Sequence, residues 1–150
     1  MARQRAVHEK PVVFRRAVAV GDLSLSPRTR SALRRGAVDT GDPVAAGALA
    51  GLLAMKRTPE LIPHCHPVPL TGSEVRVERT ARGVRATARA EAVWRTGVEM
   101  EALVGATVAL LTVWDMVKYL EKDARGLYPS TRLGPVRVVT KLKEPPGGSA

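Results

Sequence analysis

Residues Gly97–Lys122 read GVEMEALVGATVALLTVWDMVKYLEK, a stretch that contains no proline and is nearly all apolar in its middle. A helix of about 25 residues spans roughly 37 Å at 1.5 Å per residue. Its apolar middle predicts burial on most sides. The most apolar run, Ala102–Trp114, falls short of the roughly 18 to 20 residues that a membrane span needs. We therefore expect a long core helix and no membrane segment.

Alternating segments on both sides of this helix predict strands. Before it, Glu74–Arg79 and Val84–Arg95 alternate apolar and polar residues around the turn Ala81–Gly83, which is typical of a hairpin with one buried face. After it, Val136–Lys143 alternates in the same way. Near the start of the chain, Val12–Leu25 is rich in valine and alanine and predicts a further strand.

Two further helices are indicated by capping residues. Ser26 and Asp42 each precede a proline, the combination that opens a helix with an N-cap and proline at its first position. Gly36 is a suitable end for the first helix, and the second runs to about Arg57. Residues 58–72 contain four prolines, which forbid a long helix and predict a rigid, irregular loop.

The predicted order is strand, helix, helix, loop, strand, strand, helix, strand, without an internal repeat. Because two consecutive strands form a hairpin and helices connect the others, the economical arrangement is an antiparallel sheet covered by helices on one face. We therefore expect a single domain over residues 1–150 with an α+β, ferredoxin-like sandwich. Residues 1–11 and 144–150 are expected to be flexible.

Composition restricts the class of protein. The 24 lysines and arginines outnumber the 14 acidic residues and give a formal net charge of +10, which favours anionic ligands. Only five aromatic residues are present, and they are too scattered to form a platform on which bases stack. The hypothesis of a nucleic-acid-binding domain is therefore supported by charge alone. The single cysteine, Cys65, cannot form an intrachain disulfide and indicates a reducing compartment. The polar, basic N-terminus does not resemble a signal peptide, so we expect a cytoplasmic protein.

The proline-rich loop carries His64, Cys65 and His66 in succession. In an extended loop the two histidines would point to one side and the cysteine to the other. Two histidines without a third nearby ligand are a weak metal signal, and partly buried polar residues are the structural alternative. We favour a functional role because histidine titrates near neutrality and prolines hold the loop stiff.

The long helix carries two further candidate groups. At its start, Glu99, Met100 and Glu101 are as well explained by favourable charge at a helix N-terminus as by function. Farther along, Asp115 and Lys118 form an i, i+3 pair in an apolar context. Such pairs are usually exposed ion pairs. The apolar context predicts partial burial here, which would make the pair a candidate for proton transfer.

Three segments in this order, residues 56–72, 97–103 and 114–118, resemble the cyclic pyranopterin monophosphate synthase family of molybdenum cofactor biosynthesis. The likeness covers roughly residues 41–143. It implies a ferredoxin-like α+β hexamer, a trimer of dimers. It also implies a lyase that converts 3′,8-cyclised dihydro-GTP to cyclic pyranopterin monophosphate with release of pyrophosphate.

The resemblance also implies which residues act. Asp115, Lys118 and His66 would be the catalytic acids and bases. Substrate binding would fall to His64, Cys65, His66, Glu99, Met100, Glu101, Lys141 and Arg15. The implied partner is a nucleotide triphosphate substrate, with no nucleic acid and no membrane. The resemblance implies no required cofactor. Assistance by Mg²⁺ is left open, although no cluster of carboxylates in the sequence indicates a dedicated site for it.

One departure from the family pattern bears on activity. The family usually carries a lysine before its Gly-Asp pair, where this chain has Thr40 before Gly41. Threonine supplies neither the charge nor the labile proton. Either Arg34, Arg35 or another lysine compensates, or activity is reduced or lost. The alternative function is therefore a weakened relative that binds a nucleotide or pterin without turnover.

Spacing along the helix predicts an oligomer. Asp115 follows Glu101 by 14 residues, which is roughly 21 Å along a helix axis. Two groups so far apart cannot act on one atom within one subunit. Either one of them is not catalytic there, or the site is shared between chains. The apolar helix also favours an extensive interface, so we expect a homo-oligomer with active sites at a dimer interface.

Overall fold

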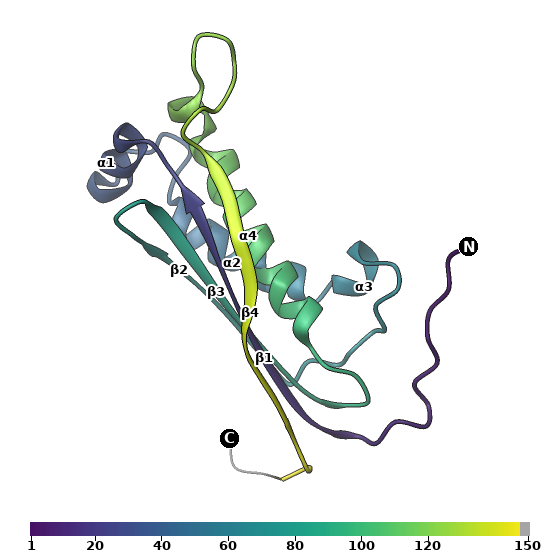
Figure 1. The fold of residues 1–150 in the computed structure, drawn as a ribbon. Helices are drawn as coiled ribbons and strands as arrows, with labels where there is room; N and C mark the ends of the chain where they lie inside the picture. The colour runs from purple at the N-terminus through teal and green to yellow at the C-terminus, as the bar shows by residue number, and fades with distance from the viewer. Residues whose placement is uncertain (148–150) are drawn as a thin grey trace.

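A computed structural model describes residues 1–147, and its centre is a four-stranded antiparallel sheet in the order β2-β3-β1-β4 (Figure 1). The strands are β1 (Val13–Ser24), β2 (Gly72–Arg79), β3 (Gly83–Trp94) and β4 (Arg132–Glu144). The chain thus follows the strand and helix succession of a ferredoxin-like fold, with three helices rather than one between β1 and β2. The predicted α+β class and antiparallel sheet are confirmed.

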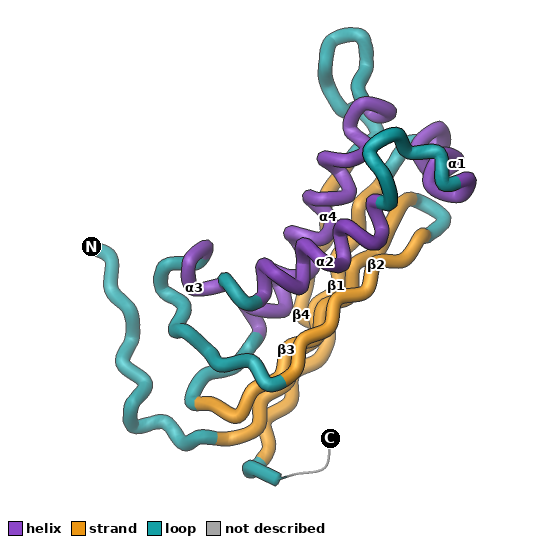
Figure 2. Tube along the Cα trace, turned by 180° about the vertical axis from the view of Figure 1, so that it is seen from behind, coloured by secondary structure: helices purple, strands orange, loops and turns teal. Residues whose placement is uncertain are grey.

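Helices cover one face of this sheet, as Figure 2 shows from behind. They are α1 (Pro27–Arg35), α2 (Pro43–Met55), α3 (Thr58–Leu61) and α4 (Glu99–Glu121). The two long helices α2 and α4 lie side by side along the sheet, and α1 lies beyond one end of them. The other face of the sheet carries no helix formed by residues 1–147.

The caps predicted for α1 and α2 are confirmed. The Ser26 side chain accepts a hydrogen bond from the backbone N–H of Thr29, and Gly36 ends α1 with a left-handed φ of 62°. The Asp42 carboxylate accepts hydrogen bonds from the first backbone amides of α2. These caps fix where the chain turns between β1 and the helical layer.

Two element boundaries differ from the prediction. The loop after α2 contains the one-turn helix α3, because Pro59 occupies an early helical position where its missing N–H has no cost. Strand β4 begins at Arg132 rather than Val136 and includes Pro135, which an edge strand tolerates. Its last residue, Glu144, pairs with Phe14. The rest of the segment predicted to be flexible lies partly outside the described residues.

The sheet presents an alanine surface to the helices. Its members are at most 1% exposed, and they are Ala17, Ala19, Ala86, Ala88, Ala90 and Ala92. Small side chains let α4 lie close to the sheet, and α4 in turn packs against α2. A Cβ added to Gly51 of α2 would lie 2.6 Å from the carbonyl oxygen of Gly105 on α4. Glycine at this position therefore allows α2 and α4 to approach closely.

Helix α4 is long and apolar enough, by length and composition, to cross a membrane. The expectation that length alone excludes a span was therefore wrong, because it considered only the most apolar run. Packing identifies the helix instead: Ala102, Ala106, Ala109, Leu110 and Val113 are fully buried in the core against the sheet and α2. This is the environment of the core helix of a folded domain.

The C-terminal end of α4 is tied to its neighbours by Glu121, which is 5% exposed. Its carboxylate accepts hydrogen bonds from the Ser26 backbone N–H at 3.0 Å, the Thr29 hydroxyl at 2.6 Å and the Thr131 hydroxyl at 2.9 Å. Burial alone would raise the pKa of Glu121, but these hydrogen bonds hold it below the ordinary value. One carboxylate thus joins α4, the start of α1 and the approach to β4.

Replacing Gly51 by alanine should lower the free energy of unfolding by about 1–3 kcal/mol, because the added methyl group meets the α4 backbone. Chemical denaturation monitored by circular dichroism measures the change. In an uncrowded helix the same substitution stabilises by up to about 1 kcal/mol. A more stable variant would therefore contradict the close packing.

Candidate functional site

A hollow of about 260 Å³ lies between the loop after α3 and the start of α4. The predicted loop and helix-start residues all line it: His64, Cys65, His66, Glu99, Met100 and Glu101. The sequence left open whether the loop and the helix start meet within one chain. The structure brings them together in the same chain.

Local structure explains how the loop faces the helix. The backbone N–H of Cys65 donates a 3.0 Å hydrogen bond to the carbonyl oxygen of Ile62, which closes a turn that contains His64. At the base of the loop, the buried Thr58 hydroxyl donates a 2.9 Å hydrogen bond to the carbonyl oxygen of Met55. The loop is therefore not extended. All three residues of the His-Cys-His run line one hollow, against the expectation that Cys65 points away.

The N-terminal arm passes beside this loop in both views of the chain (Figures 1 and 2). The Gln4 side-chain amide donates a 3.0 Å hydrogen bond to the carbonyl oxygen of Cys65. Farther along the arm, the Arg95 guanidinium donates to the carbonyl oxygens of His8 and Lys10. Nothing in the sequence pattern indicated this contact, since the arm has neither periodicity nor a motif.

Two carboxyls near the start of α4 occupy opposite electrostatic environments. Glu101 is 4% exposed, and burial together with the charge of Glu99 raises its pKa. Burial also tends to raise the pKa of Glu99, but hydrogen bonding to Lys141 and the charges of Lys141 and Arg15 hold it below the ordinary value. Glu99 is thus kept ionised, while Glu101 is pushed toward its neutral form.

Two of the predicted basic residues, Lys141 and Arg15, lie at this end of α4. The Lys141 ammonium on β4 is 2.5 Å from the Glu99 carboxylate. Arg15, on β1, is 8% exposed and donates from Nη2 to the carbonyl oxygen of Arg95 at 3.3 Å. Its buried Nε has no hydrogen-bond partner among the described residues. A buried guanidinium with an unused donor is suited to an anionic ligand.

Asp115 and Lys118 lie elsewhere, on the far half of α4. Their side chains form a 2.7 Å ion pair that is 71% and 48% exposed, respectively. The expectation of partial burial was wrong, because both side chains lie on the exposed side of α4, whereas Val117 between them faces the core. Hydrogen bonding to Asp115 raises the pKa of Lys118, so the lysine is a stable cation at neutral pH.

Thr40 lies beside this ion pair. Its hydroxyl donates a 2.8 Å hydrogen bond to the carbonyl oxygen of Met116, which lies between Asp115 and Lys118 on α4. The Asp39 backbone N–H likewise donates to the Tyr119 hydroxyl at 2.8 Å. The position where the family usually carries lysine therefore adjoins the predicted acid and base.

The predicted residues thus form two groups at the two ends of α4. The first group surrounds the hollow, and the second comprises Asp115, Lys118 and the adjoining Thr40. Because α4 is one continuous helix, Glu101 and Asp115 are roughly 21 Å apart along its axis. No group of three potential metal-ligating side chains occurs among residues 1–147.

Comparison with known proteins covers both groups. A sequence profile of the MoaC family matches residues 5–144. A Pyrococcus abyssi protein named probable cyclic pyranopterin monophosphate synthase is 52% identical over 137 residues, 91% of this chain and 86% of its own length. Proteins of the same name from Methanospirillum hungatei and Sulfurisphaera tokodaii are 47% and 44% identical. Those matches cover 95% and 91% of this chain, and 92% and 91% of the relatives.

Replacing Glu101 by glutamine should accelerate alkylation of Cys65. Burial, and then the charge of Glu101, raises the pKa of the thiol, and the thiolate is the reactive form. Removing that charge should raise the iodoacetamide rate at pH 8 by about threefold. Glu60→Gln, the same change on exposed α3, is the control and should leave the rate unaltered. Equal alkylation rates in the unaltered protein and both variants would contradict an effect of the Glu101 charge on the Cys65 thiol.

Proposed function

Because this chain belongs to the MoaC family, we propose that it is a cyclic pyranopterin monophosphate synthase of molybdenum cofactor biosynthesis. It converts 3′,8-cyclised dihydro-GTP to cyclic pyranopterin monophosphate and releases pyrophosphate. The observation that carries the proposal is the hollow at the start of α4, which is lined by two histidines, the buried carboxyl of Glu101 and the carboxylate of Glu99. Two cations, Lys141 and Arg15, lie beside Glu99.

The hollow provides groups for binding and for proton transfer. Lys141 and buried Arg15 supply positive charge for a phosphorylated substrate. The His66 imidazole has ring nitrogens that donate or accept a proton, and Glu101 has a raised pKa, so both are able to exchange protons with ring nitrogens and carbons of the substrate. His64, Cys65, Glu99 and Met100 complete the binding surface.

The Asp115–Lys118 pair provides the second set of catalytic groups. Lys118 holds its proton firmly, so it fits stabilisation of the charge that grows on departing pyrophosphate. Asp115, which is exposed and within hydrogen-bond distance of that lysine, is the proposed acid–base group of this half. His66, Asp115 and Lys118 are accordingly the proposed catalytic residues.

A complete site requires two chains if both groups act on one substrate. The 21 Å separation along α4 prevents them from meeting within one subunit. Apolar side chains are also exposed on the outer side of the helical layer: Leu49 is 59%, Leu53 51% and Leu111 49% exposed. Such surface favours an interface with another subunit. We propose a homohexamer, a trimer of dimers, with each active site at a dimer interface.

The remaining features of the proposal follow from the chemistry. The substrate is a nucleotide triphosphate, and neither nucleic acid nor a membrane takes part. No resident cofactor is required, and Mg²⁺ carried on the substrate's phosphates is compatible with the reaction. We place the enzyme in the cytoplasm, where its single cysteine stays reduced.

The proposal is tested by incubating the purified protein with freshly prepared 3′,8-cyclised dihydro-GTP. Formation of the pterin product and of pyrophosphate in equal amounts is expected. Binding without product would favour the alternative, a relative weakened by Thr40. In that case Thr40→Lys, which restores a cation beside Met116, should produce turnover.

Asp115→Asn and Lys118→Ala should each abolish turnover. The ion pair is exposed and contributes little to packing, so the thermal unfolding midpoint should stay close to that of the unaltered protein. Steady-state assays and thermal denaturation measure the two effects separately. Unchanged rates in both variants would assign the pair a purely structural role.

Mixing two inactive variants should restore activity. A Glu101→Gln chain has an intact Asp115 group, and an Asp115→Asn chain has an intact Glu101 group. If sites are shared, hybrid oligomers contain some sites with both groups intact. Activity should then rise with subunit exchange, which mass spectrometry of differently tagged chains follows. No recovery after proven exchange would exclude the shared site.

A further inference from the structure

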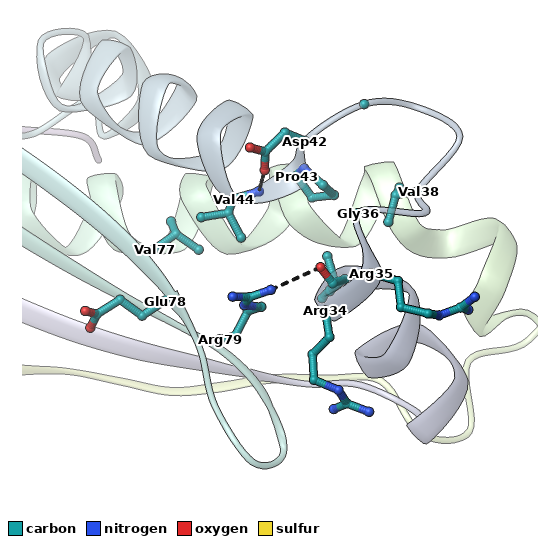
Figure 3. Close-up of a pocket in the computed structure, with 12 residues that line it drawn as sticks. Arg34, Arg35, Gly36, Val38, Asp42, Pro43, Val44, Val77, Glu78 and Arg79 are labelled. Carbon is teal, nitrogen blue, oxygen red and sulfur yellow. Dashed lines mark hydrogen bonds between the residues drawn. The ribbon is translucent and has the colours of Figure 1, made fainter.

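A second hollow, of about 800 Å³, lies between α1, the loop of residues 36–42 and β2 (Figure 3). Its floor is apolar: Leu33 and Val38 are 8% exposed, Val77 is 6% exposed, and Val44 is partly buried beside them. Its volume lies within the range of about 300–1,000 Å³ that is common for small-molecule sites.

Three exposed arginines stand around this floor: Arg34 and Arg35 at the end of α1, and Arg79 at the end of β2. None of the ion pairs among residues 1–147 includes any of them. Arg79 donates a 3.3 Å hydrogen bond to the carbonyl oxygen of Leu33, which fixes its head against α1. Figure 3 shows Arg34 and Arg35 extending from the rim toward solvent. Long exposed side chains change rotamer readily, so both can turn over the opening.

Two carboxylates also line the hollow, and neither neutralises the arginines. Asp42 accepts hydrogen bonds from the backbone amides of Val44 and Ala45. The carboxylate of Glu78 points away from the three guanidinium groups (Figure 3).

Positive charge continues beyond the rim. Arg28 and Arg30 lie on α1, and Arg82 lies on the β2–β3 turn; none of them belongs to an ion pair among the described residues. Arg30 donates from Nη1 to the carbonyl oxygen of Ala81, which joins α1 to that turn. The two basic elements therefore form one joined surface with an attractive field for anions.

We propose that this hollow binds a nucleoside phosphate, with the heterocyclic ring on the valine and leucine floor and the phosphates on Arg34, Arg35 and Arg79. Apolar surface buries a planar ring but gives no advantage to a bare inorganic anion. Guanidinium groups bind phosphate oxygens in a bidentate manner. The apolar floor and the basic rim together select a ligand that has both parts.

This site is separate from the proposed active site. Its lining residues differ from those of the hollow at the start of α4 and do not include Asp115, Lys118 or Thr40. Only Gly41, at the edge of the hollow, is next in sequence to Thr40, whose hydroxyl is turned toward α4 and bonded to the Met116 carbonyl oxygen. The proposal therefore stands on its own observations, and it is tested without a turnover assay.

Isothermal titration of the purified oligomer with ATP tests the site. We expect one ATP bound per chain, with adenosine and pyrophosphate each at least about tenfold weaker. Arg34→Ala/Arg35→Ala removes two charges that have no ion-pair partner among residues 1–147, and it should weaken ATP binding by at least about tenfold. The control Arg132→Ala/Arg137→Ala removes two exposed charges from β4 and should leave the affinity unchanged.

His66→Ala and Lys118→Ala distinguish this hollow from the two groups of the proposed active site, because ATP binding should persist in both variants. Binding lost in either of them but kept in the Arg34/Arg35 variant would place ATP in the active site and overturn the proposal. Absence of ATP binding would overturn it as well. Pyrophosphate binding as tight as ATP would show that the apolar floor contributes nothing, and it would equally reject a nucleoside phosphate site.

Discussion

The close contact between α4 and its two neighbours is the constraint on which the rest of this structure depends. On one side, alanines of β1 and β3 form the surface that α4 contacts, and on the other, Gly51 of α2 lies against the Gly105 carbonyl. Larger side chains would push the helix away from the sheet. The start of α4 would then no longer meet the His-Cys-His loop. Small residues far from any reacting group thus set the geometry of the candidate site.

Within that geometry, one turn of helix prepares two carboxyls for different tasks. Glu99 is paired with Lys141 and stays ionised, whereas buried Glu101 has a raised pKa. Neighbouring acids whose environments separate their pKa values are a common arrangement for acid–base chemistry. Here the two pKa values differ because the side chains point in different directions. The Glu99 carboxylate faces Lys141 on β4, whereas the Glu101 carboxyl faces the core.

Much of the fold could be predicted because its signals are local. Alternation marks the strands, and the N-caps Ser26 and Asp42 mark two helix starts. The candidate site depended on resemblance, because no local rule brings the loop beside α4. The exposure of Asp115 could not be predicted, since an apolar run hides which side of a helix faces outward. The hollow beneath Arg34, Arg35 and Arg79 joins α1 to β2, and no pattern within either element reveals that contact.

The position of β1 has a consequence for how the chain folds during synthesis. Among the four strands, β1 is synthesised first, yet it pairs on one edge with β3 and on the other with β4. Phe14 on β1 therefore cannot pair until Glu144 at the end of β4 has been synthesised. Contacts between such distant residues slow folding. At roughly 5–20 residues per second, a ribosome takes several seconds to make the segment between β3 and the end of β4. Until then β1 presents an unpaired edge to every neighbouring nascent chain, so mispairing of this edge is a risk for as long as β4 is missing.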